Sequence, residues 1–233
     1  MTAEGTSTKT APHHAGHRDR LRQRFVDAGP EALADYELLE LVLFRSIPRR
    51  DVKPLAKALL AQFGSLSAMA NASLRQLCEV KGISERVAID LKAVQALCQR
   101  GMKRELEDKP ILSSWSAVME YVHHAMHGLK HEQFRVLYLN KHHRLIADQI
   151  ESEGTIDRAP AYPREIIRKA LDRGATAIVL VHNHPSGDPT PSPADITLTE
   201  NVVIAGQALG IKVHDHLIVG ADGVISFKAQ GLM

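Results

Sequence analysis

The sequence has few cysteines and no long apolar segment. Cys78 and Cys98 are the only two cysteines in 233 residues, which is too few for a disulfide framework. Both occur in helical patterns, so we expect them to be small core residues. No apolar run reaches the roughly 18 residues that a membrane span requires, and no signal-peptide pattern opens the chain. We therefore expect a cytoplasmic protein without a membrane partner.

Net charge is also low, but it is unevenly distributed. The formal net charge is +2, and the chain is 44% hydrophobic and 24% charged, which is typical of globular proteins. Residues 1–109 carry 18 Lys and Arg against 14 Asp and Glu, whereas residues 110–233 carry 11 against 13. The basic bias of the first half permits contact with nucleic acid, and it fits an ordinary solvated surface equally well.

The strongest functional signal lies between residues 177 and 195. Apolar β-formers at 177–181 precede His182 and His184, and alternate residues of a strand point to the same face, so both imidazoles aim the same way. A helix begins near Asp195, after a loop that is forced by Pro185, Gly187, Pro189, Pro191 and Pro193. Two imidazoles and one carboxylate, with a fourth position open, are the ligand set of a catalytic zinc site.

Two other interpretations of this stretch are weaker. The first is a polar strand end followed by a helix that Asp195 caps, but the proline-rich loop and Ser192, three residues before Asp195, favour a metal. The second is an HNH nuclease, because residues 182–184 read His-Asn-His. That module spreads its histidines over a hairpin and a helix, so we reject it.

These residues resemble a known motif. His182-x-His184, ten further residues and Asp195, with Ser192 before it, resemble the JAMM/MPN metalloprotease motif. The string HNHPSGDPTPSPAD, followed by a helix and HDHLIVG, resembles the bacterial RadC family from Trp115 to the C-terminus. The resemblance implies a zinc-dependent peptidase or isopeptidase that acts on an unknown protein or peptide. It also implies an α+β protein, with a helical N-terminal domain before a mixed, cytidine-deaminase-like sheet domain flanked by helices.

The same resemblance implies two further catalytic residues. Glu132, directly before a strand, corresponds to the general acid/base that carries protons in the JAMM pattern. Spacing alone does not separate Glu132 from Glu151 or Glu153, which end the neighbouring strand. The Ser192 hydroxyl corresponds to a donor to the oxyanion, although a helix N-cap is the more common use of Ser at such a position.

Hydrophobic periodicity and turn residues predict the elements of residues 115–233. A helix at 115–126 precedes a hairpin of strands at 134–139 and 144–151. Residues 155–162 form either a third strand or its loop. The later elements are a helix at 163–173, the strand that carries the histidines, a helix at 194–209, and strands at 211–219 and 224–227. The mixed order predicts one sheet flanked by helices.

The preceding part of the chain is predicted to be helical. We expect a disordered tail at 1–16, a helical domain at 17–105 and a linker at 106–114. Helices are expected at 35–43, where Asp35 is the N-cap, and at 51–63, 65–70, 74–80 and 85–100.

Residues 77–94 resemble a helix-hairpin-helix, a module that binds the DNA backbone. Lys81, Gly82 and Ser84 are therefore possible backbone contacts. The pattern usually has Gly where this chain has Ser84, so a packing module is an equal alternative. If the hairpin does bind DNA, the protein could be a DNA-associated repair or recombination accessory factor rather than an enzyme.

The remaining histidines are weaker metal candidates. His214 and His216 form a second His-x-His on a strand. They could be a second metal pair, but we favour hydrogen-bonding roles near the strand end, behind the first site, for Asp215 and His216. Adjacent pairs such as His142 and His143 diverge and make poor chelates.

Overall fold

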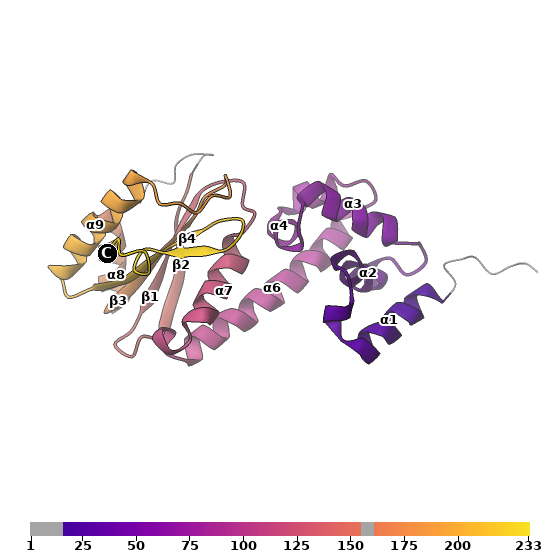
Figure 1. Cartoon of the computed structure of the whole chain (residues 1–233), viewed down its shortest axis with the longest axis horizontal. Helices are drawn as coiled ribbons and strands as arrows, with labels where there is room; N and C mark the ends of the chain where they lie inside the picture. Colours follow the sequence, from indigo (N-terminus) through magenta and orange to yellow (C-terminus); the bar gives the residue numbers. More distant parts are fainter. Residues whose placement is uncertain (1–15, 155–160) are drawn as a thin grey trace, which may run out of the picture. The chain divides into compact units, whose positions relative to one another are not determined.

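The computed structural model describes residues 16–154 and 161–233, which belong to two compact units (Figure 1). The first unit contains the described residues up to Leu66 together with Ser73–Leu91, and the second contains Ser67–Ala72 and Lys92–Met233. The expectations for the tail before Gly16 and for positions 155–160 fall outside the described residues. Within the described part of the chain, no helix is long and apolar enough to cross a membrane.

The first unit is helical, as predicted. Its helix ends follow local signals: Gly29 and Gly64 adopt φ values of 78° and 83° after two helices, and the Ser73 hydroxyl accepts from the Gln76 N–H at the start of another. Asp35 is not an N-cap but the first helical residue. The elements are α1 (His17–Ala28), a 3₁₀ turn (Pro30–Ala32), α2 (Asp35–Ser46), α3 (Lys53–Phe63), α5 (Leu74–Cys78) and the first turns of α6 (Glu85–Asp108).

The division between the units differs from the expected one. α4 (Leu66–Asn71) and the later part of α6 belong largely to the second unit. The segment expected to be a linker, 106–114, is part of that unit as well, because the side chains of Leu106 and Ile111 are fully buried in its core.

The two cysteines are exposed free thiols, so the expectation that they lie in the core was wrong. Cys78 ends α5, in which the preceding Leu77 is the buried residue. Cys98 follows Leu97, which is 71% exposed. Helical periodicity identified the helices correctly but did not show which side of each helix is buried.

The second unit is a five-stranded mixed sheet, which confirms the predicted α+β class. The strand order is β2-β1-β3-β4-β5, and the one parallel pair is β3 with β4. The strands are β1 (Gln133–Leu139), β2 (Leu145–Glu153), β3 (Ala177–Asn183), β4 (Lys212–Val219) and β5 (Val224–Ser226). The helices are α7 (Trp115–Met126), preceded by a 3₁₀ turn at Ile111–Ser113, α8 (Pro163–Asp172) and α9 (Pro193–Gln207).

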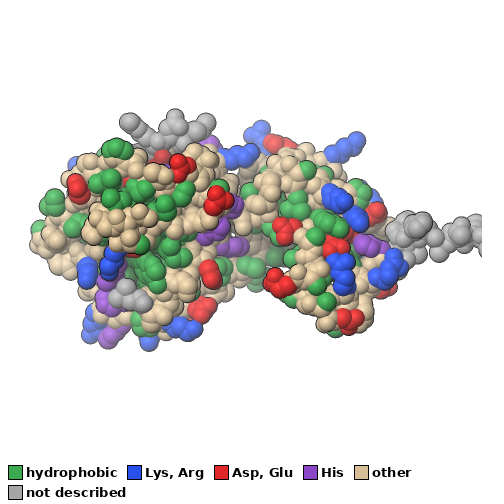
Figure 2. Space-filling view, in the orientation of Figure 1, with side chains coloured by type: hydrophobic (Ala, Val, Ile, Leu, Met, Phe, Trp, Pro, Cys, Tyr) green, Lys and Arg blue, Asp and Glu red, His purple; other side chains and the backbone are tan. Residues whose placement is uncertain are grey.

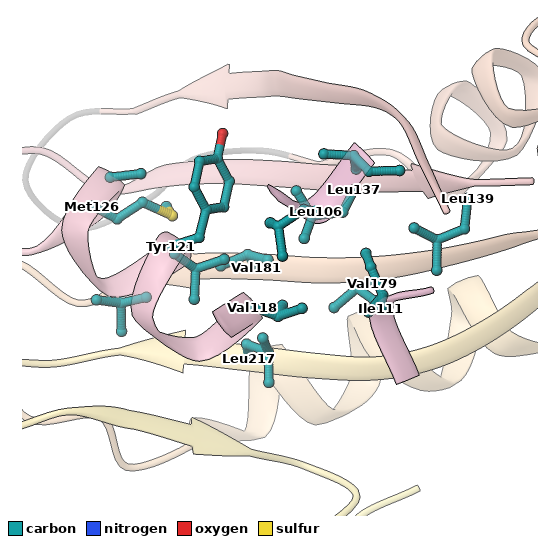
Figure 3. Close-up of a cluster of buried hydrophobic side chains, with 14 of the residues drawn as sticks. Leu106, Ile111, Val118, Tyr121, Met126, Leu137, Leu139, Val179, Val181 and Leu217 are labelled. Carbon is teal, nitrogen blue, oxygen red and sulfur yellow. The ribbon is translucent and has the colours of Figure 1, made fainter. Parts of the chain in front are cut away.

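Helices cover both faces of the sheet. α7 packs on one face against alternate residues of the central strands, among them Leu137, Val179 and Leu217 (Figure 3). α8 and α9 pack on the other face, against residues such as Val136 and Leu180. All seven residues of β3 are buried, which explains its continuous apolar sequence. A fully buried Val or Leu side chain contributes about 1.5–3 kcal/mol through the hydrophobic effect, so the end of β3 is a rigid platform.

A bulge separates the two histidines of the second His-x-His. Opposite Ile178 and Val179 of β3, the register skips from Val213 to Asp215, and the extra residue, His214, is left out of the ladder. Its Nε2 lies 2.9 Å from Nδ1 of His143, whereas His216 hydrogen-bonds to residues on the α9 side. The structure therefore does not support the two as a second metal pair.

Burial of His214 predicts a loss of stability in acid. Burial is the main reason that its pKa falls from 6.5 to about 4, and the charge of His143 adds to this effect. The unfolded chain binds this proton near pH 6.5 and the folded chain near pH 4. Between these values the unfolded state binds more protons, so the free energy of unfolding falls as the pH decreases through that window.

His214→Gln should therefore weaken the decline in stability between pH 6.5 and pH 4, measured by urea unfolding across that range. The exposed His142 provides a control, and His142→Gln should keep the wild-type decline. The same pH dependence in His214→Gln as in the wild type would contradict the assignment.

Candidate metal centre

The candidate metal centre forms where the chain leaves β3 and α9 begins. β3 ends at Asn183, and the backbone N–H of His184 then donates to the Val219 carbonyl at 3.0 Å, so the chain continues along β4. The Ala221 N–H donates to the Gly187 carbonyl at 2.8 Å, which holds the loop against the β4–β5 turn. Gly187 has a φ of 86°, a conformation that glycine adopts without steric cost.

The structure brings His182, His184 and Asp195 together. The two Nε2 atoms are 3.0 Å apart, and Asp195 Oδ1 and Oδ2 lie 3.3 Å from His182 Nε2 and 3.5 Å from His184 Nε2. Ligands about 2.0–2.1 Å from a tetrahedral zinc ion are separated by about 3.3 Å. The spacing of the three donors therefore fits a zinc ion, and among the residues that the structure describes they form the one His/Cys/Asp/Glu group of this kind.

A buried hydrogen-bond chain fixes the tautomer of His182. Thr199 Oγ1 lies 2.6 Å from the Asp195 carbonyl oxygen, which can only accept, so the hydroxyl donates to it and accepts from His216 Nδ1–H at 2.6 Å. Burial holds the pKa of His216 well below its usual value, so this imidazole is neutral. Its Nε2 then accepts from His182 Nδ1–H at 2.8 Å, and the lone pair of His182 Nε2 faces the other donors.

The tautomer of His184 is fixed in the same way. Its Nδ1 lies 2.7 Å from the Asp188 carbonyl oxygen, so Nδ1 carries the proton and the Nε2 lone pair of the neutral ring faces His182. The lone pairs of two neutral rings and a carboxylate repel one another at these distances unless a cation lies among them.

The electrostatics of the ligand group agree with this requirement. The hydrogen bond to Asp195 is the largest cause that raises the pKa of His184. Burial alone would raise the pKa of Asp195, but the hydrogen bonds that His182 and His184 donate to it when they carry a proton at Nε2 hold that pKa well below the usual range. The group is therefore a receptor for positive charge, whether a proton or a metal ion.

Ser192 fixes the third ligand. The Ser192 Oγ donates to Asp195 Oδ2 at 2.6 Å and accepts from the Asp195 backbone N–H at 3.2 Å. Ser192, not Asp195, is thus the N-cap of α9, and the pair forms a capping box. The N-cap alternative for Ser192 is confirmed, while its role as an oxyanion donor stays a prediction.

The charge of Glu132, one of the candidate proton carriers, acts on His184 at this centre. After the hydrogen bond to Asp195, which is the leading cause, the Glu132 carboxylate contributes to the raised pKa of His184. Glu132 immediately precedes β1, and its backbone carbonyl accepts from the Gly154 N–H at 2.9 Å. Its side chain is partly exposed, as a group that exchanges protons with a substrate must be.

The two alternative glutamates have other partners. Glu151 forms a partly buried ion pair with Lys169 of α8. Glu153 accepts from the Gln133 side-chain amide at 2.7 Å. Both carboxylates are thus engaged in contacts within the sheet and with α8. Their engagement favours Glu132 as the candidate proton carrier.

The hairpin in the first unit is exposed at Lys81, Gly82 and Ser84. Gly82 has a φ of 102°, and the Arg50 guanidinium donates to its carbonyl at 3.3 Å. The Ser84 hydroxyl accepts from the Val87 N–H at 3.4 Å, at the start of α6. Ser at this position therefore caps a helix, which explains the departure from Gly, and contact with a DNA backbone stays a prediction.

Sequence reasoning missed two residues that hold the site. Thr199 lies four residues after Asp195, one helical turn further along the same face of α9, and this spacing was the available signal. Asn183, between the two histidines, is only 2% exposed, and the sequence gave no indication of its hydrogen-bond partners.

Comparison with known families agrees with this geometry. Residues 112–232 match the RadC-like JAB domain, and residues 13–89 match the UPF0758 N-terminal domain. The fold and the gathered His-His-Asp group define the second unit as a JAB domain, a class that is often metal-dependent. The chain belongs to the RadC family.

Removing a ligand should abolish stoichiometric metal binding. Because His182→Ala leaves two donors, we expect a loss of zinc affinity larger than the 10–100-fold that outer-sphere changes cause. Elemental analysis after equilibration with zinc measures the effect, with His142→Ala as a control that should behave as the wild type. Equal zinc content in His182→Ala and the wild type would refute the site.

Removing the hydroxyl that orients His216 should weaken the same site. Thr199→Val keeps the shape of the side chain but leaves His216 Nδ1–H without its acceptor, so zinc affinity should fall about 10–100-fold. Competition with a chromophoric chelator measures this change. Thr199→Ser keeps the hydroxyl and should retain most of the affinity, whereas wild-type affinity in Thr199→Val would show that the chain does not orient His182.

Proposed function

We propose that this protein is a zinc-dependent hydrolase of amide bonds, a metallopeptidase or isopeptidase of the JAMM type that acts on a protein or peptide. The observation that supports it most is the convergence of two fixed imidazole lone pairs and one carboxylate at 3.0–3.5 Å. Two nitrogen donors and one carboxylate oxygen suit zinc. The match to the RadC-like JAB domain is consistent with such a role.

Each residue of the centre has a distinct task in this proposal. His182, His184 and Asp195 would hold the ion, which would supply Lewis-acid activation of a water molecule. Glu132 accepts a proton from the attacking water and returns it to the leaving amine. The Ser192 hydroxyl donates a hydrogen bond to the oxyanion. To do so, it must give up its hydrogen bond to Asp195 Oδ2.

The alternative, a DNA-associated accessory role through residues 77–94, has weaker support. The hairpin contains one glycine, Gly82, and the carbonyl of Gly82 already accepts a hydrogen bond from the Arg50 guanidinium. In the face shown in Figure 2, the basic side chains of the first unit are interspersed with acidic ones rather than gathered in one stripe. A DNA-binding face usually concentrates Lys and Arg on one side.

Glu132→Gln should separate metal binding from hydrolysis. The variant keeps all three ligands, so it should retain about one zinc per chain, but it cannot accept a proton and should lose at least 100-fold in cleavage rate. Comparison of new N-termini generated in a proteome by the wild type and the variant measures cleavage. Glu153→Gln is the matched control and should keep activity, whereas full activity in Glu132→Gln would overturn the assignment.

A further inference from the structure

Beyond the pair of Phe134 with His182, the sheet divides. That pair is the last one in the β1–β3 ladder. From there the main chain of β3 continues along β4, through the His184 N–H that donates to Val219. The start of β1 instead stays with β2, through the Gly154 N–H. The peptide groups that flank Glu132 on its β3 side therefore have no strand backbone to pair with.

The Asn183 side chain takes the place of that missing backbone. Its Oδ1 accepts from the Gln133 N–H at 2.9 Å, and its Nδ2 donates to the His131 carbonyl at 3.1 Å. Asn183 thus bonds one peptide group on each side of Glu132. An amide side chain suits this position because it offers one acceptor and one donor in a fixed arrangement, whereas a carboxylate would face the His131 carbonyl with a second acceptor.

Asn183 also stands between the two candidate ligands in the sequence. Because successive residues of a strand point to opposite faces, His182 points to the α8 and α9 side, where it stacks on Phe134, and Asn183 is free to reach across to β1. A displacement of Glu132 would therefore have to move the residue that joins His182 to His184.

We propose that Asn183 is a positioning residue that fixes Glu132 relative to the metal ligands. The inference rests on the proposed function, in which Glu132 carries protons at the centre. It assigns to the middle residue of the His-Asn-His sequence a task that is independent of holding the ion. Loss of Asn183 should leave the ligands in place while Glu132 moves.

The test uses full-length protein loaded with Co²⁺, whose visible absorption changes as the site loses a proton. The midpoint of this change is measured against pH for the wild type, Glu132→Gln, Asn183→Ala and the double variant. A carboxylate near an ionising group changes its pKa by about 1–3 pH units, so Glu132→Gln should move the midpoint by about that much. Asn183→Ala should bind Co²⁺ stoichiometrically, move the midpoint in the same direction and add nothing in the Glu132→Gln background.

Asn140→Ala is the matched control. The Asn140 Oδ1 accepts from two backbone N–H groups, those of His142 and Arg144, in the turn at the other end of β1. Its loss removes comparable hydrogen bonds and should lower stability without moving the midpoint. If Asn183→Ala fails to fold by circular dichroism, Asn183→Ser, whose short side chain cannot bridge both peptides, replaces it.

The outcomes distinguish this inference from the proposed function. A wild-type midpoint in a folded Asn183 variant, or a shift equally large with and without Glu132, overturns the positioning role and leaves the hydrolase proposal intact. Failure of the wild type to bind Co²⁺, or an unchanged midpoint in Glu132→Gln, overturns the proposed function and the inference with it.

Discussion

The structure depends on one electrostatic constraint, the opposition of two imidazole lone pairs and a carboxylate. His182 and His184 each have their Nδ1–H committed to a neighbouring acceptor, so when the rings are neutral both Nε2 lone pairs face the Asp195 carboxylate. That arrangement is unfavourable in a partly buried place unless a cation joins it. The surrounding fold keeps the donors close together, so the group is a receptor for positive charge.

The fold meets this constraint with rigid elements. β3 is buried on both faces, α9 begins at a capping box that includes Asp195, and Thr199 and His216 connect the two elements through buried hydrogen bonds. The chain from His182 through His216 and Thr199 returns to the backbone of Asp195. A shift of either ligand would therefore break bonds that are shielded from water, which is costly.

The sequence predicted what local pattern can determine. Alternation and proline content placed His182 and His184 at a strand end, and the spacing of Ser192 and Asp195 marked a helix start. The partners of His216 and Asn183 could not be predicted, because they depend on strand order and on a bulge that skips His214. The same limit applies to the cysteines, where a helical pattern does not show what packs against it, and to residues 106–108, which were expected in a linker but end α6.

The position of the centre follows from the way the sheet ends. β1 and β3 are neighbours only as far as Phe134 and His182; past that pair each strand follows its other neighbour, β2 or β4. At that strand end, side chains from both strands and from the following loop can converge without disturbing the ladder. Glu132, immediately before β1, and the two imidazoles at the end of β3 therefore lie where the pairing of these strands has stopped. Their relative placement must then come from side-chain hydrogen bonds, because the backbone ladder has already ended.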